Sequence, residues 1–332
     1  MISAVQETTW TVVISRGQSR NPAKRGLEQA IADAAEKMPG IDVLVIPHLY
    51  DLPRDSQSYQ ELSQVEGNLV VVSWIFERAA HWVLDRNGIR GQFDPLRLTE
   101  DEGEEESETA DVAVGEVEEK ERVTDLYPRP DRGIHCVDLK SIEKPDQLIE
   151  EIRQLVGLAD PEPDTSLPIV GGKLQQVDET TSRRWYPVID FNRCTNCMEC
   201  VDFCLFGVYG VDDAETILVE QPDNCRKGCP ACSRVCPENA IIFPQHKAPA
   251  IAGAETEGDE GFKIDLSQLF GAPAKDDDPI ATAARERDEQ LLLAGRDAIG
   301  IDDQLLKRQA DLQASPKDQL DELIDSLDAL DL

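Results

Sequence analysis

Eight of the nine cysteines in this chain lie in two runs between Cys194 and Cys236, and no other feature restricts its possible folds as strongly. The first run consists of Cys194, Cys197, Cys200 and Cys204. The second run consists of Cys225, Cys229, Cys232 and Cys236. Three closely spaced thiolates of each run can converge on one metal centre, while a short helix carries the fourth towards a different centre. The pattern therefore indicates two metal centres, each completed by the last cysteine of the other run.

This module closely resembles the bacterial-type dicluster ferredoxin domain, which carries two 4Fe–4S clusters, over residues 185–244. The resemblance implies that one cluster is held by Cys194, Cys197, Cys200 and Cys236. It implies that the other cluster is held by Cys225, Cys229, Cys232 and Cys204. An internal quasi-repeat supports the resemblance, because each run leads from a helix end into a short strand, at Phe206–Val211 and at Ala240–Phe243.

Two positions depart from the family pattern. Three residues separate Cys225 from Cys229 where the family has two, and Leu205 follows Cys204 where the family has proline. The extra residue, near Gly228, could alter the loop around the second cluster and shift its potential or weaken its site. Neither departure removes a ligand from the expected set.

Two zinc sites of four cysteines each are the competing interpretation, because zinc also prefers tetrahedral sulfur ligation. Zinc ribbons, however, pair two short Cys-x-x-Cys knuckles, and three cysteines in seven residues suit one tetrahedral ion poorly. The spacing therefore favours iron–sulfur clusters. The ninth cysteine, Cys136, lies in a predicted buried strand and is expected to be a small core hydrophobe, with a redox or ligand role as the alternative.

Strand and helix signals alternate before the cysteine module. Apolar runs predict strands at residues 11–15, 42–46, 68–73 and 133–139, and helical spacing predicts helices at 24–38, 58–65, 75–87 and 145–156. Apolar runs without alternation suit a parallel sheet with helices on both faces. We therefore expect an α/β domain over residues 9–98 and 132–158, in which the last strand and helix return to the first sheet.

The remaining segments are expected to connect or extend these two domains. Residues 99–131 are expected to be a disordered acidic linker or insertion, because residues 100–122 hold 12 acidic and 2 basic side chains. Residues 159–184 are predicted to be an interdomain linker, 185–247 an α+β ferredoxin-type domain, and 248–332 an acidic tail. Helical spacing returns in the tail at 280–293 and 317–330. The apolar stripe of the second patch fits either a surface helix or a helix that docks on a partner.

Charge restricts the possible partners. The formal net charge of −33 argues against nucleic acid and anionic membrane surfaces, since both bind through Lys and Arg. No apolar run is long enough to span a bilayer, and the N-terminus has no signal-peptide pattern. We therefore expect a cytoplasmic protein without membrane insertion, in a compartment where clustered cysteines bind metal before they form disulfides.

The α/β segment carries only weak functional signals. Arg16–Arg20 follows the first predicted strand, at the end where open α/β sheets bind ligands. This opening is faintly similar to sirohydrochlorin-chelatase-like domains, but it lacks their histidine, which argues against metal-insertion chemistry. The histidines are scattered and are expected to be surface or core residues: His48, His81, His135 and His246. No nucleotide-binding fingerprint and no catalytic constellation is present.

These observations together predict a two-domain protein whose function is one-electron transfer through two 4Fe–4S clusters. The α/β domain would recognise a redox partner, and the acidic surface would favour a partner with a basic docking surface. One alternative is an iron–sulfur subunit of an oxidoreductase whose α/β domain binds a small ligand. Another is a purely structural role for the clusters.

Overall fold

A computed structural model describes residues 10–96, 122–127, 129–142, 145–158, 172–255 and 279–300. The chain divides into two units, Met1–Pro273 and Ala274–Leu332. The second unit contains helix α9 (Pro279–Leu293), at the position of the helical patch predicted at 280–293. The patch predicted at 317–330 lies outside the described residues. No helix within the described ranges is both long and apolar enough to cross a bilayer.

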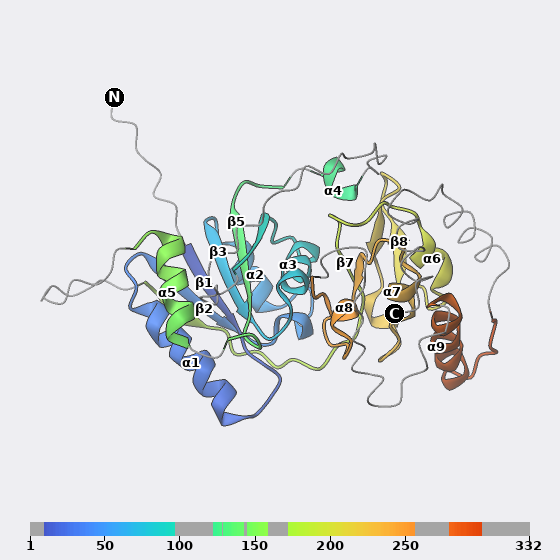
Figure 1. The fold of residues 1–332 in the computed structure, drawn as a ribbon, viewed down its shortest axis with the longest axis horizontal. Helices are drawn as coiled ribbons and strands as arrows, with labels where there is room; N and C mark the ends of the chain where they lie inside the picture. The colour runs from blue at the N-terminus through green and yellow to red at the C-terminus, as the bar shows by residue number, and fades with distance from the viewer. Residues whose placement is uncertain are drawn as a thin grey trace, which may run out of the picture. The chain divides into compact units, whose positions relative to one another are not determined.

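A six-stranded parallel sheet forms the centre of the first unit, with the strand order β4-β5-β3-β1-β2-β6 (Figure 1). Its strands are β1 (Trp10–Ser15), β2 (Ile41–Ile46), β3 (Asn68–Ser73), β4 (Gln92–Pro95), β5 (Gly133–Asp138) and β6 (Leu174–Gln176). Strand β1 pairs in register with β2 from Trp10–Ile41 to Ser15–Ile46, and with β3 from Trp10–Asn68 to Ile14–Val72. The predicted α/β sheet is thereby confirmed, including the return of β5 to the side of β3.

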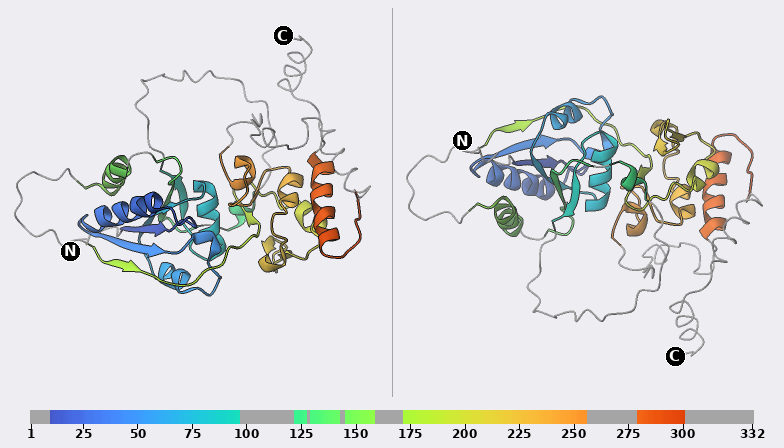
Figure 2. Two further views of the ribbon diagram at one scale, coloured as in Figure 1. Left: turned by 90° about the horizontal axis from the view of Figure 1, so that it is seen from below. Right: turned by 90° about the horizontal axis from the view of Figure 1, so that it is seen from above.

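Helices cover both faces of this sheet. One face packs on α1 (Pro22–Glu36) and α5 (Pro145–Val156), and the other on α2 (Gln57–Ser63) and α3 (Glu77–Arg86). Figure 2 shows α1 and α5 on the same side of the strands and α2 on the opposite side. Successive β1 residues serve opposite faces, since Val12 and Val13 belong to different core clusters and neither is exposed to solvent. Burial on both faces explains the unbroken apolar runs of these strands.

Two edge strands of the sheet and helix α4 are among the elements that had no counterpart in the sequence prediction. The edge strand β4 alternates polar and apolar residues and ends in proline, and the opposite edge strand β6 has only three residues. Helix α4 (Val123–Leu126) lies in the range expected to be an acidic linker. Strand β6 comes from the range expected to link the domains, yet it pairs with β2 from Val43–Leu174 to Val45–Gln176.

The cysteine module is built from short helices and strands. Helices α6 (Glu199–Phe203) and α7 (Ala231–Val235) each end at a cysteine. Strand β7 (Val188–Ile189) pairs with β10 (Ile241–Ile242), and β8 (Tyr209–Val211) pairs with β9 (Ile217–Val219), both antiparallel. The 3-10 helix η2 (Pro222–Asn224) precedes the second cysteine run, and α8 (Pro249–Ala252) follows β10. Each cysteine run therefore passes from a helix into a strand, as the quasi-repeat predicts.

The module and the sheet share one hydrophobic core. Val188 and Ile242 of the module belong to the same buried cluster as Trp82 of α3. The 3-10 helix η1 (Leu49–Asp51), after β2, contributes Tyr50, whose ring stacks on Tyr186 with centroids 4.3 Å apart. The Tyr50 hydroxyl donates to the Tyr186 carbonyl at 2.5 Å and accepts from the Tyr186 N–H at 2.6 Å. Both side chains are fully buried, so η1 fixes the chain where it enters the module.

Candidate functional site

The first cysteine run forms a tight loop in front of α6. Asn196 and Met198 both have left-handed backbone conformations, with φ of 58° and 64°, and these let the loop close within a few residues. The Asn196 side chain fixes the loop to the β8–β9 hairpin: its Oδ1 accepts from the Ile217 N–H at 3.0 Å and its Nδ2 donates to the Glu215 carbonyl at 2.9 Å. The loop thus has a defined conformation before any metal is considered.

The second run encloses a similar loop, with the additional residue that the sequence showed. Gly228 has a φ of 88°, a conformation that L-residues rarely adopt. The Cys229 N–H donates to the Arg226 carbonyl at 3.0 Å and closes a turn over the inserted position. The inserted residue is therefore absorbed by a turn ahead of α7, which carries Cys232.

The thiols form two groups, within each of which the thiols affect one another's pKa. Burial first, and then the thiols of Cys236, Cys197 and Cys194, raise the pKa of Cys200. In the other group burial comes first, and the thiols of Cys225, Cys204 and Cys229 raise the pKa of Cys232. The two groups have the membership that the ferredoxin resemblance implies, with Cys236 and Cys204 exchanged between the runs. The assignment of these residues as cluster ligands stays a prediction.

Donors point at two of these sulfur atoms and at one backbone carbonyl of the second run. The Tyr209 hydroxyl donates to Cys232 Sγ at 3.1 Å, and the Ala240 N–H donates to Cys236 Sγ at 3.3 Å. The Trp185 indole N–H donates to the Cys229 carbonyl at 3.1 Å. These donors favour the thiolate form of the sulfurs that they reach. Tyr209 fell within a predicted strand and Trp185 within the predicted domain, but their contacts with the cysteines had no sequence signal.

Burial works against the thiolate form and is the larger effect. It raises the pKa of Cys194 to about 11 and also raises that of Cys225, so these two thiols by themselves stay protonated at neutral pH. A bound cation reverses this balance, because coordination deprotonates a thiol outright. In the described parts of the chain no three Cys, His, Asp or Glu side chains converge on one point that could hold a single ion.

The remaining cysteine and three of the histidines lie in the α/β part, whereas His246 lies in the module with its ring 6.3 Å from that of Trp185. Cys136 is fully buried in β5, as predicted, and burial raises the pKa of its thiol. Burial lowers the pKa of His81, on α3, to about 3. His48 lies beside η1, and His135 lies 3.2 Å from an Asp94 carboxylate oxygen. The structure therefore leaves the eight clustered cysteines as the main candidate site.

Comparisons with known proteins indicate a ferredoxin-type domain within the chain. Over 66 residues, 20% of its length, the chain is 50% identical to an uncharacterized ferredoxin of Methanocaldococcus jannaschii, MJ0251, and spans 44% of that protein. Over 61 residues, 18% of its length, it is 36% identical to the pyruvate synthase subunit PorD of the same organism and spans 69% of that subunit. No protein-family model and no solved structure matches the chain.

Proposed function

Because the chain belongs, through its ferredoxin domain, to the family of the PorD subunit, we propose that it transfers single electrons through two 4Fe–4S clusters. One observation carries the proposal: eight thiols lie in two groups of four neighbours, with hydrogen-bond donors aimed at their sulfurs. When bound, the clusters supply one-electron redox chemistry. The protein's contribution is to hold them and to set their potentials.

We assign the first cluster to Cys194, Cys197, Cys200 and Cys236. We assign the second cluster to Cys225, Cys229, Cys232 and Cys204. Tyr209 and the Ala240 N–H donate to sulfur, and such donors stabilise the more negative charge of a reduced site. Burial of Cys200 and Cys232, which are 6% and 8% exposed, opposes that charge. The potentials follow from the balance of these two effects.

Access to the clusters differs within each group. Cys197 is exposed, and Cys204, Cys225 and Cys236 are partly exposed. An exposed ligand brings a cluster close to the surface, where a partner can dock within range for electron transfer. We place this exchange in the cytoplasm, where the eight thiols stay reduced and free to bind iron.

The partner is expected to have a basic docking surface. The chain has 66 acidic and 33 basic side chains, so its field attracts a basic protein and accelerates encounter. A basic c-type cytochrome tests this: the reduced chain should reduce it at a rate that falls steeply with added salt. A rate independent of salt would contradict the electrostatic part of the proposal.

A second candidate is an iron–sulfur subunit of an oxidoreductase whose α/β domain binds a small ligand. The similarity to PorD, which is a subunit of an enzyme, favours it. The third possibility, clusters that only hold the fold together, predicts centres that resist reduction by dithionite. Reduction of both centres would exclude it.

The decisive experiment measures iron, sulfide and zinc in the anaerobically purified full chain, with EPR spectra before and after dithionite. We expect about eight iron and eight sulfide per chain, and an interacting signal after reduction. Two zinc ions without sulfide would overturn the proposal. About four iron would mean that one site, expected to be the one beside Gly228, is lost.

Matched cysteine variants test the assignment. Cys200→Ser should lose about half of the iron, because it removes a ligand of the first cluster only. Cys136→Ser is the control, since it removes a buried thiol that lies in the sheet, and it should keep the full iron content. Equal iron in the two variants would contradict the assignment.

A further inference from the structure

A cavity of about 520 Å³ opens at one end of the parallel sheet, away from the thiol groups. Most of its lining residues come directly after three strands: Arg16 and Gly17 after β1, Pro47 and His48 after β2, and Val177–Thr181 with Arg183 after β6. These are the carboxyl ends of the strands, next to the point where the connections change direction between β1 and β3. Open α/β sheets bind their ligands at this edge.

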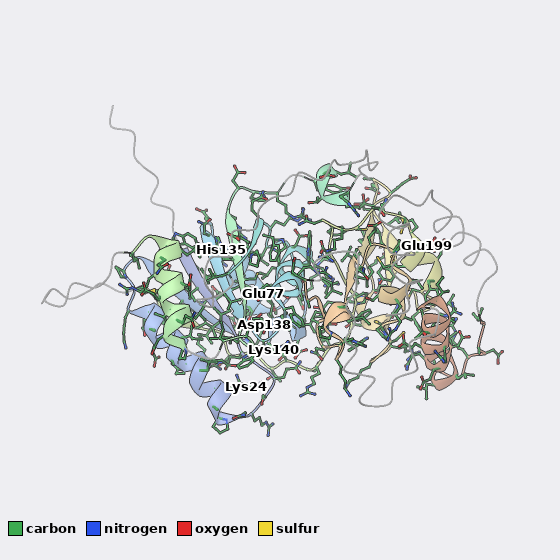
Figure 3. All side chains as sticks on the ribbon, viewed as in Figure 1. Lys24, Glu77, His135, Asp138, Lys140 and Glu199 are labelled. Carbon is green, nitrogen blue, oxygen red and sulfur yellow. The ribbon has the colours of Figure 1, made fainter. Side chains whose placement is uncertain are left out.

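Three arginines and three acidic side chains line the cavity. Arg16, Arg25 and Arg183 line it. Figure 3 shows Lys140, directly after β5, and Lys24 of α1 at the same end of the sheet. These two lysines are occupied elsewhere: Lys140 Nζ lies 3.6 Å from a carboxylate oxygen of Asp138, and Lys24 Nζ lies 4.2 Å from the centre of the Trp74 ring. Of the three arginines, Arg25 is held by Glu28 at 2.8 Å and by the Gly17 carbonyl at 2.7 Å. Arg16 donates to the neutral Gln176 Oε1 at 2.8 Å, so Arg16 and Arg183 are the cations best placed to receive a ligand.

The acidic side chains of the cavity already have donors. Asp51 accepts from Gln18 Nε2 at 2.6 Å, from the Arg184 N–H at 3.1 Å and from Gln245 Nε2 at 2.9 Å. Glu179 accepts from the N–H groups of Gln57 and Ser58 at the start of α2, both at 3.2 Å. Their charge is thus partly compensated within the protein.

Asp178 is the most exposed of these acids. It accepts from Gln176 Nε2 at 2.7 Å, and its carboxylate lies 3.6 Å from Arg16. Its side chain is 75% exposed, so water screens its charge. An anion in the cavity could displace this loose contact with Arg16.

Two side chains in the cavity wall have nitrogen atoms that make no hydrogen bond to a described residue, and these atoms can bind a ligand. Within the described residues the Arg183 guanidinium makes no hydrogen bond or ion pair, although it is exposed at the cavity. His48 is only 8% exposed, and its Nδ1 lies 3.4 Å from Asp51 but makes no hydrogen bond to any described residue. Burial lowers the pKa of His48, so its imidazole is neutral at pH 7 and can serve as a donor or an acceptor.

We propose that this cavity binds a small molecule through an oxyanion, a phosphate or a carboxylate group, held by Arg16 and Arg183. Arginine suits this task because its planar group forms two parallel hydrogen bonds with such oxyanions. Arg25, in the first turn of α1, adds positive charge to the cavity wall while Glu28 holds its guanidinium at 2.8 Å. Volume beyond that of one oxyanion leaves room for the rest of an organic molecule. The inference goes beyond electron transfer and does not depend on it.

The cavity also has a direct connection to the cysteine module. The Asp51 carboxylate that borders it accepts from the backbone of Arg184, and the next residue, Trp185, donates to the Cys229 carbonyl. Gln245, which follows β10, donates to the same carboxylate. Two hydrogen bonds, with the Arg184–Trp185 peptide between them, therefore join the Asp51 carboxylate at the cavity to the loop of the second thiol group.

The test uses the full chain, purified anaerobically and matched for iron content. Pyrophosphate and citrate are titrated by calorimetry, with sodium chloride at equal ionic strength as the reference. We expect at least one of the two anions to bind, and the stronger one identifies the phosphate or the carboxylate source. Arg183→Gln should weaken that binding about tenfold, because it removes a charge-assisted hydrogen bond to the anion while breaking no hydrogen bond or ion pair between described residues.

Arg90→Gln is the matched control. Arg90 is also an exposed arginine, and it lines a separate cavity of about 320 Å³ with Arg54 and Arg86. The control should bind like the wild type. Absence of binding by both anions would overturn the proposal, and so would equal losses in the two variants. Because iron content is measured in the same samples, failure of this site is distinguishable from failure of the clusters.

Discussion

The Tyr50 hydroxyl forms hydrogen bonds with two backbone groups of Tyr186 at once. Tyr50→Phe, which removes only one oxygen atom, should therefore destabilise the protein more than the loss of a single hydrogen bond would. The variant leaves the Tyr186 N–H and carbonyl, bonded at 2.6 Å and 2.5 Å in the wild type, without a partner in a buried site. A buried polar group left unpaired costs about 1–3 kcal/mol. Two such groups give an expected loss of about 2–6 kcal/mol in the free energy of unfolding.

Tyr186→Phe is the matched control for this prediction. It keeps the stacked rings and removes one hydrogen bond, from the Tyr186 hydroxyl to the Tyr50 carbonyl at 3.0 Å. Its expected cost is about 1–3 kcal/mol, half that of Tyr50→Phe. Burial raises the pKa of Tyr186 to about 12, so its hydroxyl is a protonated donor across the usable pH range.

Thermal unfolding at matched iron content ranks the two variants, and hydrogen exchange reports the cause. The amide of residue 186 should lose protection in Tyr50→Phe and keep it in Tyr186→Phe, because only the first removes its acceptor. Equal destabilisation by the two variants, or an amide that stays protected in both, would refute the reasoning.

Three further predictions concern pH, packing and potential. Burial lowers the pKa of His81 to about 3 from its ordinary value of 6.5, so the fold excludes the protonated imidazole. The resulting stability, at most about 5 kcal/mol, is present above pH 6.5 and is lost as pH falls from 6.5 towards 3. His81→Phe should therefore flatten the pH dependence of the free energy of unfolding in that range. Gly172→Ala should destabilise the protein by about 1–3 kcal/mol in denaturant titrations, since its Cβ would lie 1.5 Å from the Ile41 carbonyl oxygen, whereas Gly26→Ala, with nothing within 4 Å, should be neutral or stabilising. Tyr209→Phe removes a donor to a cysteine sulfur and should lower one of the two reduction potentials in an EPR-monitored titration, while an unchanged pair of potentials would count against our cluster assignment.

The central strands were predictable because burial on both faces leaves an unbroken apolar run. The strand predicted at 68–73 and the helix predicted at 145–156 match β3 and α5 to the residue. The edge strands β4 and β6 carried no such signal, because an edge strand is held by one neighbour and tolerates polar residues and proline. Strand pairing across a long stretch of sequence, rather than local composition, decides where β6 lies.

Some features of the candidate site could likewise be predicted from the sequence, and others could not. The spacing of the cysteines pointed to two centres, because their chemistry depends on residue type and local geometry. The donor from Tyr209 and the paired bonds of Tyr50 depend on contacts between distant segments, which spacing does not encode. Arg16 lay in a stretch that the sequence marked for ligand binding, but Arg183 joins it only because β6 brings the chain back to that edge.

Strand β6 also determines which fragments of this chain would keep the α/β sheet intact. Sequence composition suggests cutting after residue 158, but that cut removes the strand that covers the open edge of β2. The fragment would expose unpaired N–H and carbonyl groups along β2, and such an edge promotes strand exchange and aggregation between copies. It would also lose the cavity wall from Val177 to Arg183. A fragment that ends before residue 172 would thus misrepresent both the solubility and the ligand binding of the α/β part, and only fragments that retain β6 and the residues after it are fair tests of either.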